Sequence, residues 1–411
     1  MKLDLMDMLY VMSYALDKVE AELLGIDSGH CRRVAFLSLI MAKYCDFPEE
    51  ELRDFVGCCL LHDNALTEFI HEELCTNKYS DVSIHDIAFD NEDRMYLHHS
   101  IIGEKNIRLL PFRTDVRNII QYHHENADGS GTLKKTAADT SLKAQILHLA
   151  DLVDITRKLM SMTNGEFEET RAWVKQNSGK LFSERSVELF LKAVRYEDIV
   201  RLQRDDGIYS YLWQEFQPSA HDYTDEEIRN IADFFAGIVD YKSSFTQYHS
   251  RGVADKAELM ALFYEFDAEK TIRFYLAGAM HDVGKLVISN DILEKPGKLT
   301  VDEFAEMKNH ASATYAVLSR IKGIPDIVEW ASNHHEKLNG TGYPRGLSEK
   351  DLSFESQLLA CVDIYQALTE KRPYKDGLSH EQTMAIMYDM VAKGELNGQM
   401  VRDIDAVMAK G

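Results

Sequence analysis

The stretch "HDVGKL" (residues 281–286) decides how the whole chain is interpreted, because it places a histidine, an aspartate and a lysine in one short apolar segment. An earlier stretch, "LHDNAL" (residues 61–66), repeats the His-Asp pair but has Leu66 where the later one has Lys285. Adjacent residues on a helix point about 100° apart, so such a pair can address two neighbouring points in space. The chain therefore carries one chemical motif twice, and the two versions differ at a charged position.

A set of histidines and aspartates extends this repeat over most of the chain. The interval between the first two histidines is the same in both copies, and a further histidine, a double histidine and an aspartate in an apolar helix follow in the same order. Self-similarity of this kind predicts a repeated structural unit. The two sets are His30, His62, Asp63, His99, His123, His124 and Asp151 in the first copy, and His249, His281, Asp282, His310, His334, His335 and Asp363 in the second.

The fold class follows from the spacing of the apolar residues. These recur at helical intervals along nearly the whole chain, as in "CRRVAFLSLIMAKYC" (residues 31–45), and only seven prolines are present. Thr224 with Glu227 three residues later is the signature of a capping box at the head of a long helix. We therefore predict an all-α protein of two tandem helical bundles, residues 1–194 and 236–411, joined by a helical connector at residues 195–235.

Composition excludes several classes of function. The chain has 411 residues, of which 68 are acidic and 46 basic, and its formal charge of −22 disfavours binding of a nucleic-acid polymer. Six cysteines without a C-x-x-C pair predict free thiols in a reducing compartment. The acidic, amphipathic segment at residues 1–25 is not a signal peptide, and no apolar run is long enough to span a bilayer. We expect a cytoplasmic protein that does not associate with membranes.

Five imidazoles and two carboxylates on separate helices of one copy are typical of a metal site in the core of a helical bundle. Such nitrogen and oxygen donors suit Fe, Mn or Zn better than Ca or Mg, and seven ligands are too many for one tetrahedral ion. Two divalent ions about 3.5 to 4 Å apart can stabilise both the attacking and the leaving oxygens of a displacement at phosphorus. This chemistry favours hydrolysis of a phosphate ester, in which Lys285 would neutralise charge on the phosphate or help to protonate the leaving group.

The second copy resembles the HD-GYP subgroup of the HD phosphohydrolase superfamily over essentially all of residues 240–411. Several separate motifs carry this resemblance, and they occur in order along the chain. They are "YHSRGVA" (248–254), "HDVGKL" (281–286), "LEKPGKLT" (293–300), "MKNHASATYAVL" (307–318), "NHHEKLNGTGYPRGL" (333–347) and "DIYQALTEKRPYK" (363–375).

The resemblance implies a metal-dependent phosphodiesterase that hydrolyses a cyclic dinucleotide, chiefly cyclic di-GMP, by attack of a metal-bridging hydroxide at a binuclear site. The cofactors would be two divalent transition metals, Fe or Mn first, with Zn, Ni or Co as alternatives. Three-metal members carry a glutamate four residues before the first histidine ligand, where this chain has Phe245, so two metals are expected. The implied site residues are the metal ligands His249, His281, Asp282, His310, His334, His335 and Asp363, the catalytic residues Asp282 and Lys285, and the substrate-binding residues Tyr343, Arg372 and Lys375.

The first copy keeps every type of metal ligand but has lost the residues that would handle phosphate. It has Leu66 for the lysine, "GSGTL" (129–133) for the loop that carries Tyr343, and no "RPY" after Asp151. We interpret it as a degenerate HD-GYP-like domain with a regulatory role, and three alternatives stay open for its ligands: a bound metal, slow residual hydrolysis and sensing.

Two alternatives to cyclic di-GMP hydrolysis stay open. One is a phosphodiesterase for cyclic GMP-AMP or another nucleotide, and the other is a signalling scaffold that binds a nucleotide without hydrolysing it. The sequence does not decide the base preference, the reaction product or whether the protein forms a homodimer.

Overall fold

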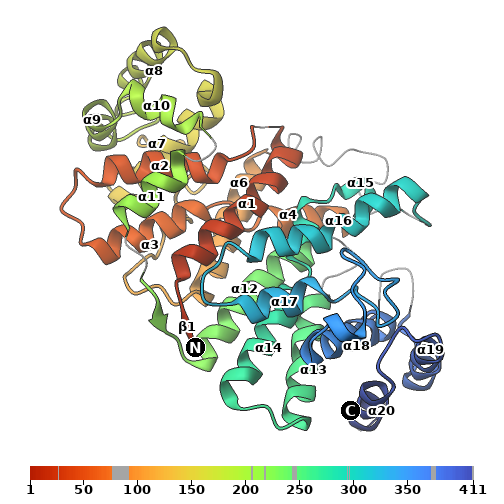
Figure 1. The fold of residues 1–411 in the computed structure, drawn as a ribbon. Coiled ribbons are helices and arrows are strands. Elements are labelled where there is room, and N and C mark those ends of the chain that lie inside the picture. The colour runs from red at the N-terminus through yellow and green to blue at the C-terminus, as the bar shows by residue number, and fades with distance from the viewer. Residues whose placement is uncertain are drawn as a thin grey trace. The chain divides into compact units, whose positions relative to one another are not determined.

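The computed structural model of the chain describes residues 1–25, 27–75, 92–204, 207–216, 219–242, 248–293, 295, 297–371 and 376–409. The prediction of an all-α protein is confirmed, since the only strands in these ranges are β1 (Lys2–Leu3) and β2 (His221–Asp222), which pair antiparallel. The chain forms two compact units (Figure 1). The first unit is Asp4–Ala220, and the second is His221–Gly411 together with Met1–Leu3.

The first unit is a bundle around α2, which is buried along nearly its whole length and packs against α1, α3 and α7. Its helices are α1 (Leu5–Leu24), α2 (His30–Ala42), α3 (Glu49–Leu60), α4 (Leu66–Cys75), α6 (Glu92–Asn106), η1 (Ile107–Leu109), α7 (Leu142–Arg157), η2 (Leu159–Ser161), α8 (Asn164–Gln176), α9 (Glu184–Ala193), α10 (Tyr196–Leu202) and α11 (Gly207–Glu215).

The stretch that the sequence predicts as a connector, residues 195–235, is divided between the units. α10 and α11 belong to the first unit, and aromatic side chains hold α11 against α1 and α2. The Trp213 indole donates its N–H to Asp7 at 3.1 Å, and the Tyr211 ring lies 4.9 Å from that of Phe36 in a T-shaped contact. The helix that follows, α12 (Asp225–Tyr241), belongs to the second unit.

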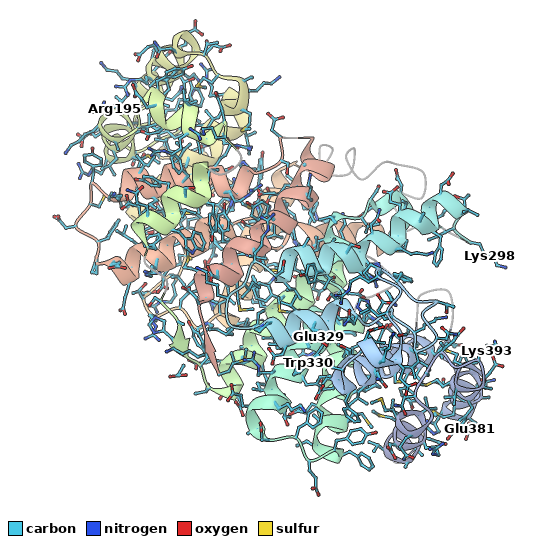
Figure 2. All side chains as sticks on the ribbon, in the orientation of Figure 1. Arg195, Lys298, Glu329, Trp330, Glu381 and Lys393 are labelled. Carbon is cyan, nitrogen blue, oxygen red and sulfur yellow. The ribbon has the colours of Figure 1, made fainter. Side chains whose placement is uncertain are left out.

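In the second unit α14 packs against α12, α13 and α17. Its Phe274 lies edge-on to Trp330 of α17, with 5.7 Å between the ring centres; Trp330 is labelled in Figure 2. α12 begins with the predicted capping box, in which Thr224 and Glu227 satisfy each other's backbone N–H groups. The remaining helices are α13 (His249–Phe263), α14 (Ala268–Met280), η3 (Val283–Val287), α15 (Asn290–Leu293), α16 (Val301–Leu318), α17 (Pro325–Ser332), η4 (Glu349–Asp351), α18 (Phe354–Thr369), α19 (His380–Ala392) and α20 (Gly398–Met408).

Both units anchor the helix that carries the first histidine in the same way. In the first unit the buried carboxylate of Asp17 on α1 accepts the backbone N–H of Cys31 at 2.9 Å. In the second, buried Asp240 on α12 accepts the backbone N–H of Ser250 at 3.0 Å. Because the first N–H groups of a helix have no partner within it, each carboxylate fixes the start of α2 or α13. The duplication seen in the sequence is therefore also present in local structure.

Gly284, within "HDVGKL", lets η3 approach α16 closely. A Cβ at this position would collide with the carbonyl oxygen of His310, and the Gly284 N–H donates to the Thr314 hydroxyl at 3.0 Å. In the first unit Ala65 stands at the position of Gly284, and glycine is found instead across the contact, as Gly103 on α6. In each copy a glycine thus lies at the contact between the segment after the His-Asp pair and the helix of the next histidine, Gly284 on the first side in one copy and Gly103 on the second side in the other.

We predict that Gly284→Ala destabilises the second unit by about 1 to 3 kcal/mol, because the added methyl group overpacks a backbone contact. The shift of η3 should also lower activity, since His281 and Asp282 precede it directly. Gly237→Ala, in α12 where a Cβ meets no atom within 4 Å, is the matched control and should leave stability unchanged or raise it. Thermal unfolding followed by circular dichroism checks both, and equal melting temperatures would contradict the packing argument.

Candidate metal centres

The structure brings all seven predicted residues of the second copy into one cluster. Five elements supply them, and all seven side chains are buried except that of His335, which is half-buried. The contributions are His249 from the start of α13, His281 and Asp282 from the end of α14, His310 from α16, His334 and His335 from the turn after α17, and Asp363 from α18.

Asp282 lies at the centre, and its two carboxylate oxygens face different imidazoles. Oδ2 is 3.2 Å from Nε2 of His281 and 3.6 Å from Nε2 of His249. Oδ1 is 3.5 Å from Nε2 of His310 and 3.8 Å from Nε2 of His334. A carboxylate in this position can bridge two cations, each held by the imidazoles on one side.

The inner histidines are held with Nε2 toward the cluster. His281 donates its Nδ1–H to the carbonyl of Gly278 at 2.7 Å, and His310 and His334 donate theirs to carbonyls one turn earlier at 2.6 Å each. A carbonyl can only accept, so these bonds place the proton on Nδ1 and leave the lone pair of Nε2 pointing inward. This is the form in which histidine binds a metal ion.

Several buried atoms in the cluster fit a cation. Nε2 of His281 and Oδ1 of Asp282 are buried and have no hydrogen-bond partner among the described residues. Nε2 of His310 lies 3.4 Å from Nε2 of His334, and each bears a lone pair when its ring is neutral. Buried polar atoms are normally satisfied, so the donor set is suited to positive charge between these atoms.

Burial and charge set the protonation of these groups. Burial lowers the pKa of His335 to about 3, so this ring is neutral near pH 7. Although burial alone would raise it, the neighbouring His281 and Lys285 hold the pKa of Asp282 well below its usual value. Burial would lower the pKa of His249, but hydrogen bonds to Asp363 and Glu370 outweigh it and raise the value to about 10. Neutral imidazole and ionised carboxylate are the forms that metals require, and at His249 a bound cation would have to displace a proton.

The predicted catalytic and substrate residues lie around this cluster where the structure describes them. Nζ of half-buried Lys285 donates to Oδ2 of Asp282 at 2.5 Å. The Tyr343 ring lies 4.7 Å from that of His335 at an interplanar angle of 38°. Three positions used in the sequence interpretation, Arg372, Lys375 and Phe245, lie outside the described residues.

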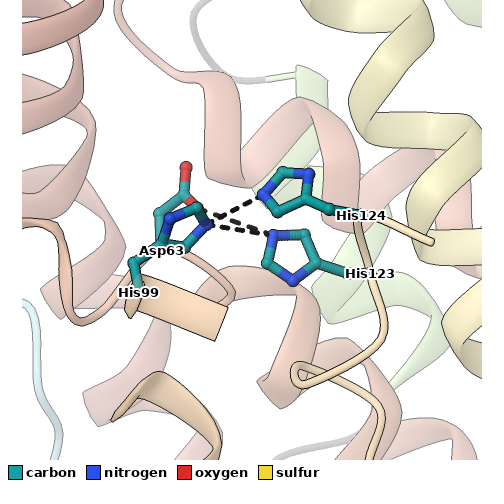
Figure 3. A group of neighbouring side chains, drawn as sticks. All are labelled: Asp63, His99, His123 and His124. Carbon is teal, nitrogen blue, oxygen red and sulfur yellow. Dashed lines mark hydrogen bonds and ion pairs between the residues drawn. The ribbon is translucent and has the colours of Figure 1, made fainter. Parts of the chain in front are cut away.

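The seven residues of the first copy form a matching cluster, and Figure 3 shows four of them, Asp63, His99, His123 and His124. Oδ1 of Asp63 is 3.3 Å from Nε2 of His99 and 3.8 Å from Nε2 of His123, while Oδ2 is 3.5 Å from Nε2 of His62. His30, His124 and Asp151 complete the cluster. Nε2 of His30 lies 3.1 Å from Oδ1 of Asp151. Nδ1 of His124 lies 3.7 Å from Oδ2 of Asp151, and its Nε2 lies 2.8 Å from Nε2 of His99.

Sequence reasoning missed the carboxylates that orient the first histidine of each cluster. His30 donates its Nδ1–H to Asp154 at 2.7 Å, and Arg33 binds both oxygens of Asp154 at 2.7 and 2.8 Å. In the second unit His249 donates to Glu370 at 3.1 Å. Such a carboxylate fixes the tautomer of a ligating histidine and raises its basicity. The available signal was Asp154 one helical turn after Asp151.

A tyrosine in the first unit corrects the expectation that this copy lacks a counterpart of Tyr343. The Tyr96 ring lies 4.3 Å from that of His124 at 37°, nearly the geometry of Tyr343 on His335. It comes from α6 rather than from the loop after the double histidine, so the sequence alignment of the two copies could not show it. Leu66, in contrast, is a buried apolar side chain at the position of Lys285.

Comparison with known proteins agrees with this duplicated site. Residues 28–156 match the HD domain family, and residues 234–399 match a second HD domain description. The chain therefore carries two HD domains and belongs to the HD domain family. Among the helices that the structure describes, none is both long and apolar enough to cross a lipid bilayer.

Individual relatives differ in how much of the chain they match. The chain is 29% identical over 410 residues to 3'3'-cGAMP-specific phosphodiesterase 1 of Vibrio cholerae, covering 95% of this chain and 89% of that protein. It is 31% identical over 168 residues to a cyclic di-GMP phosphodiesterase response regulator of Xanthomonas campestris, covering 40% of this chain and 44% of the relative. The crystal structure of a cyclic GMP-AMP specific phosphodiesterase of V. cholerae shares the fold, with a TM-score of 0.67, 23% identity and coverage of 100% and 98%.

We predict that Asp282→Asn lowers both metal content and activity, because the amide removes the negative charge that faces both groups of imidazoles. Asp389→Asn, an exposed aspartate that pairs with Lys393 on α19, is the control and should change neither. Metal analysis of the purified full-length variants by mass spectrometry gives the measurement. Full metal content and full turnover in Asp282→Asn would rule out a bridging role.

Proposed function

We propose that the second unit hydrolyses a phosphodiester bond of a cyclic dinucleotide in a metal-dependent reaction. The observation that carries this proposal is Asp282, whose two oxygens each face a pair of imidazoles while Lys285 contacts one of them. The names of the relatives, which include phosphodiesterases for cyclic di-GMP and for 3'3'-cGAMP, support the substrate class.

Between these substrates we favour 3'3'-cGAMP. The sequence alone favours cyclic di-GMP, through the motifs of the second copy. The relative that matches along 95% of this chain is specific for 3'3'-cGAMP, whereas the cyclic di-GMP relative matches 40% of it. Because similarity along both domains is a stronger argument than similarity along one, 3'3'-cGAMP is the first candidate and cyclic di-GMP the second.

The seven clustered side chains of the second unit would hold two divalent ions, for which we propose Fe or Mn because a mixed set of imidazoles and carboxylates suits transition metals better than Ca or Mg. When bound, these ions would supply Lewis-acid stabilisation of charge at the reacting phosphate. Glu370 contacts Nδ1 of His249 and Asp363 contacts its Nε2, and these two carboxylates keep the ring in place.

The remaining roles belong to cationic and phenolic groups of the chain. Burial would lower the pKa of Lys285, but Asp282 beside it raises the pKa above its ordinary value, so the ammonium stays charged and can neutralise a phosphate oxygen or protonate the leaving oxygen. Tyr343, stacked on His335, would position the same phosphate through its hydroxyl. Arg372 and Lys375 stay proposed phosphate contacts from the sequence alone.

For the first unit we propose a metal-binding, regulatory domain without hydrolytic activity. Its seven ligands lie together and its inner histidines are oriented as in the second unit, with His62, His99 and His123 donating to carbonyls at 2.9, 2.6 and 2.5 Å. Leu66 cannot neutralise a phosphate. We also place the protein in the cytoplasm, because Cys31, Cys58, Cys59 and Cys361 are buried free thiols.

We predict that the full-length protein, loaded with Fe or Mn, converts 3'3'-cGAMP to a linear dinucleotide or mononucleotides faster than it converts cyclic di-GMP. Chromatography of the products over a panel of cyclic dinucleotides and mononucleotides measures this. Chelation of the metal should abolish turnover, and re-addition should restore it. Absence of turnover of every nucleotide by the metal-loaded protein would refute the proposal in favour of a binding scaffold.

We predict that Lys285→Leu, which copies Leu66, keeps its metal but lowers turnover by on the order of 10² to 10³, the usual effect of one lost electrostatic or proton-transfer contribution. The reciprocal variant Leu66→Lys is the matched control and should not activate the first unit, tested by introducing it into a chain that also carries Lys285→Leu. Parental turnover by Lys285→Leu with its metals in place would show that the lysine has only a structural role.

A further inference from the structure

The part of α16 that leads to His310 presents apolar and cationic side chains where a soluble helix usually presents charge. Val301 is 86% exposed and Phe304 is 48% exposed, and Lys308 is half-buried one turn further along the same face. His310 follows two residues later as a member of the metal cluster. We call Val301, Phe304 and Lys308 the α16 ridge. His310 lies on another face of α16, and the approach of Lys308 to Tyr343 is what connects the ridge to the candidate active site.

Lys308 lies between two aromatic rings of this region. Its Nζ is 4.7 Å from the centre of the Phe304 ring and 5.6 Å from that of Tyr343, both within the range of cation–π attraction. Tyr343 in turn lies 4.7 Å from His335 and 6.3 Å from His310. A continuous row of side chains thus runs from the metal ligands through the phenol to the ammonium and the exposed phenyl ring.

The ammonium of Lys308 has no carboxylate partner among the described residues. Three other lysines of the second unit are paired, at distances from Nζ to oxygen of 2.6 Å for Lys295 with Glu303, 2.5 Å for Lys270 with Glu355 and 3.0 Å for Lys337 with Glu395. Lys298, Lys322 and Lys350, which also lack a carboxylate partner among the described residues, are exposed, whereas Lys308 is half-buried. In a chain with a formal charge of −22, an unpaired half-buried cation beside the active site is a local attractor for an anion.

We propose that Lys308 binds the phosphodiester that is not being cleaved, and that Phe304 stacks against a base of the same ligand. This inference rests on the proposed function, since a cyclic dinucleotide has a second phosphate and two flat bases close to the reacting bond. The metal cluster and Lys285 can neutralise only the phosphate that they contact, and Lys308 offers a further cation, next to Tyr343, for the second one. An exposed aromatic ring next to a phosphate-binding cation is the usual way to hold a nucleotide base. The α16 ridge would then select dinucleotides over smaller phosphodiesters.

The test compares two substrates in full-length, metal-loaded protein. Lys308→Met and Phe304→Ala should each raise KM for 3'3'-cGAMP roughly tenfold, the scale of one lost stacking or phosphate contact, with kcat nearly unchanged. Neither should alter turnover of bis(p-nitrophenyl) phosphate, which has one phosphate and no purine. Lys308→Arg should largely restore KM, because the charge is kept. Lys393→Met removes a paired surface lysine and serves as the control.

Each outcome separates this inference from the proposed function. An unchanged KM in both variants, or an equal loss on both substrates, would overturn the role of the α16 ridge while leaving the hydrolase intact. If the parent protein hydrolyses no cyclic dinucleotide, equilibrium binding of 3'3'-cGAMP decides. Weaker binding by Lys308→Met and Phe304→Ala than by the parent protein would support nucleotide binding by the α16 ridge even without hydrolysis. Absence of binding, or equal binding by the variants and the parent, would overturn it.

Discussion

Hydrogen bonds from histidine Nδ1 to backbone carbonyls one turn earlier are the interaction on which both sites depend. Six histidines make this bond, at 2.5 to 2.9 Å, and the first histidine of each cluster makes the equivalent bond to a carboxylate. Because the helix itself supplies the acceptor, each ring is oriented by local backbone and needs no long-range partner. The result is a set of inward nitrogen lone pairs around a central aspartate, whose mutual repulsion a cation relieves.

The two units use this shared framework with different charge around it. In the second, Lys285 donates to Oδ2 of Asp282, which adds positive charge where an anion would approach the cluster. In the first, Leu66 replaces the lysine, and the buried carboxyl of Glu20 lies near enough to Asp63 for the two to interact. Burial first and then Asp63 raise the pKa of Glu20 to about 8. With that pKa Glu20 is mainly neutral near pH 7, so the decisive difference is the missing cation at position 66, and this is the physical basis for assigning the chemistry to the second unit.

The sequence predicts the fold class, the duplication and which residues meet in each cluster, because ligand type and spacing repeat along the chain. It does not predict Asp154, Arg33 and Glu370, which orient the first histidines, because their contacts depend on how α7 and α18 are rotated against α2 and α13. The sequence does not predict the position of Tyr96 for the same reason. Its ring, from α6, packs on His124 as the ring of the loop residue Tyr343 packs on His335 in the other copy. Spacing within one helix is visible in a sequence, whereas the direction of side chains between helices is not.

The most direct test of the account is anomalous X-ray diffraction from crystals of the metal-loaded protein, collected on both sides of the Fe and Mn absorption edges. The account predicts two peaks in the second unit, one on each side of Asp282, with His249 and His281 near one and His310 and His334 near the other. A single peak that does not contact Asp282, or no peak among these side chains, would contradict the binuclear centre on which the proposed hydrolysis depends.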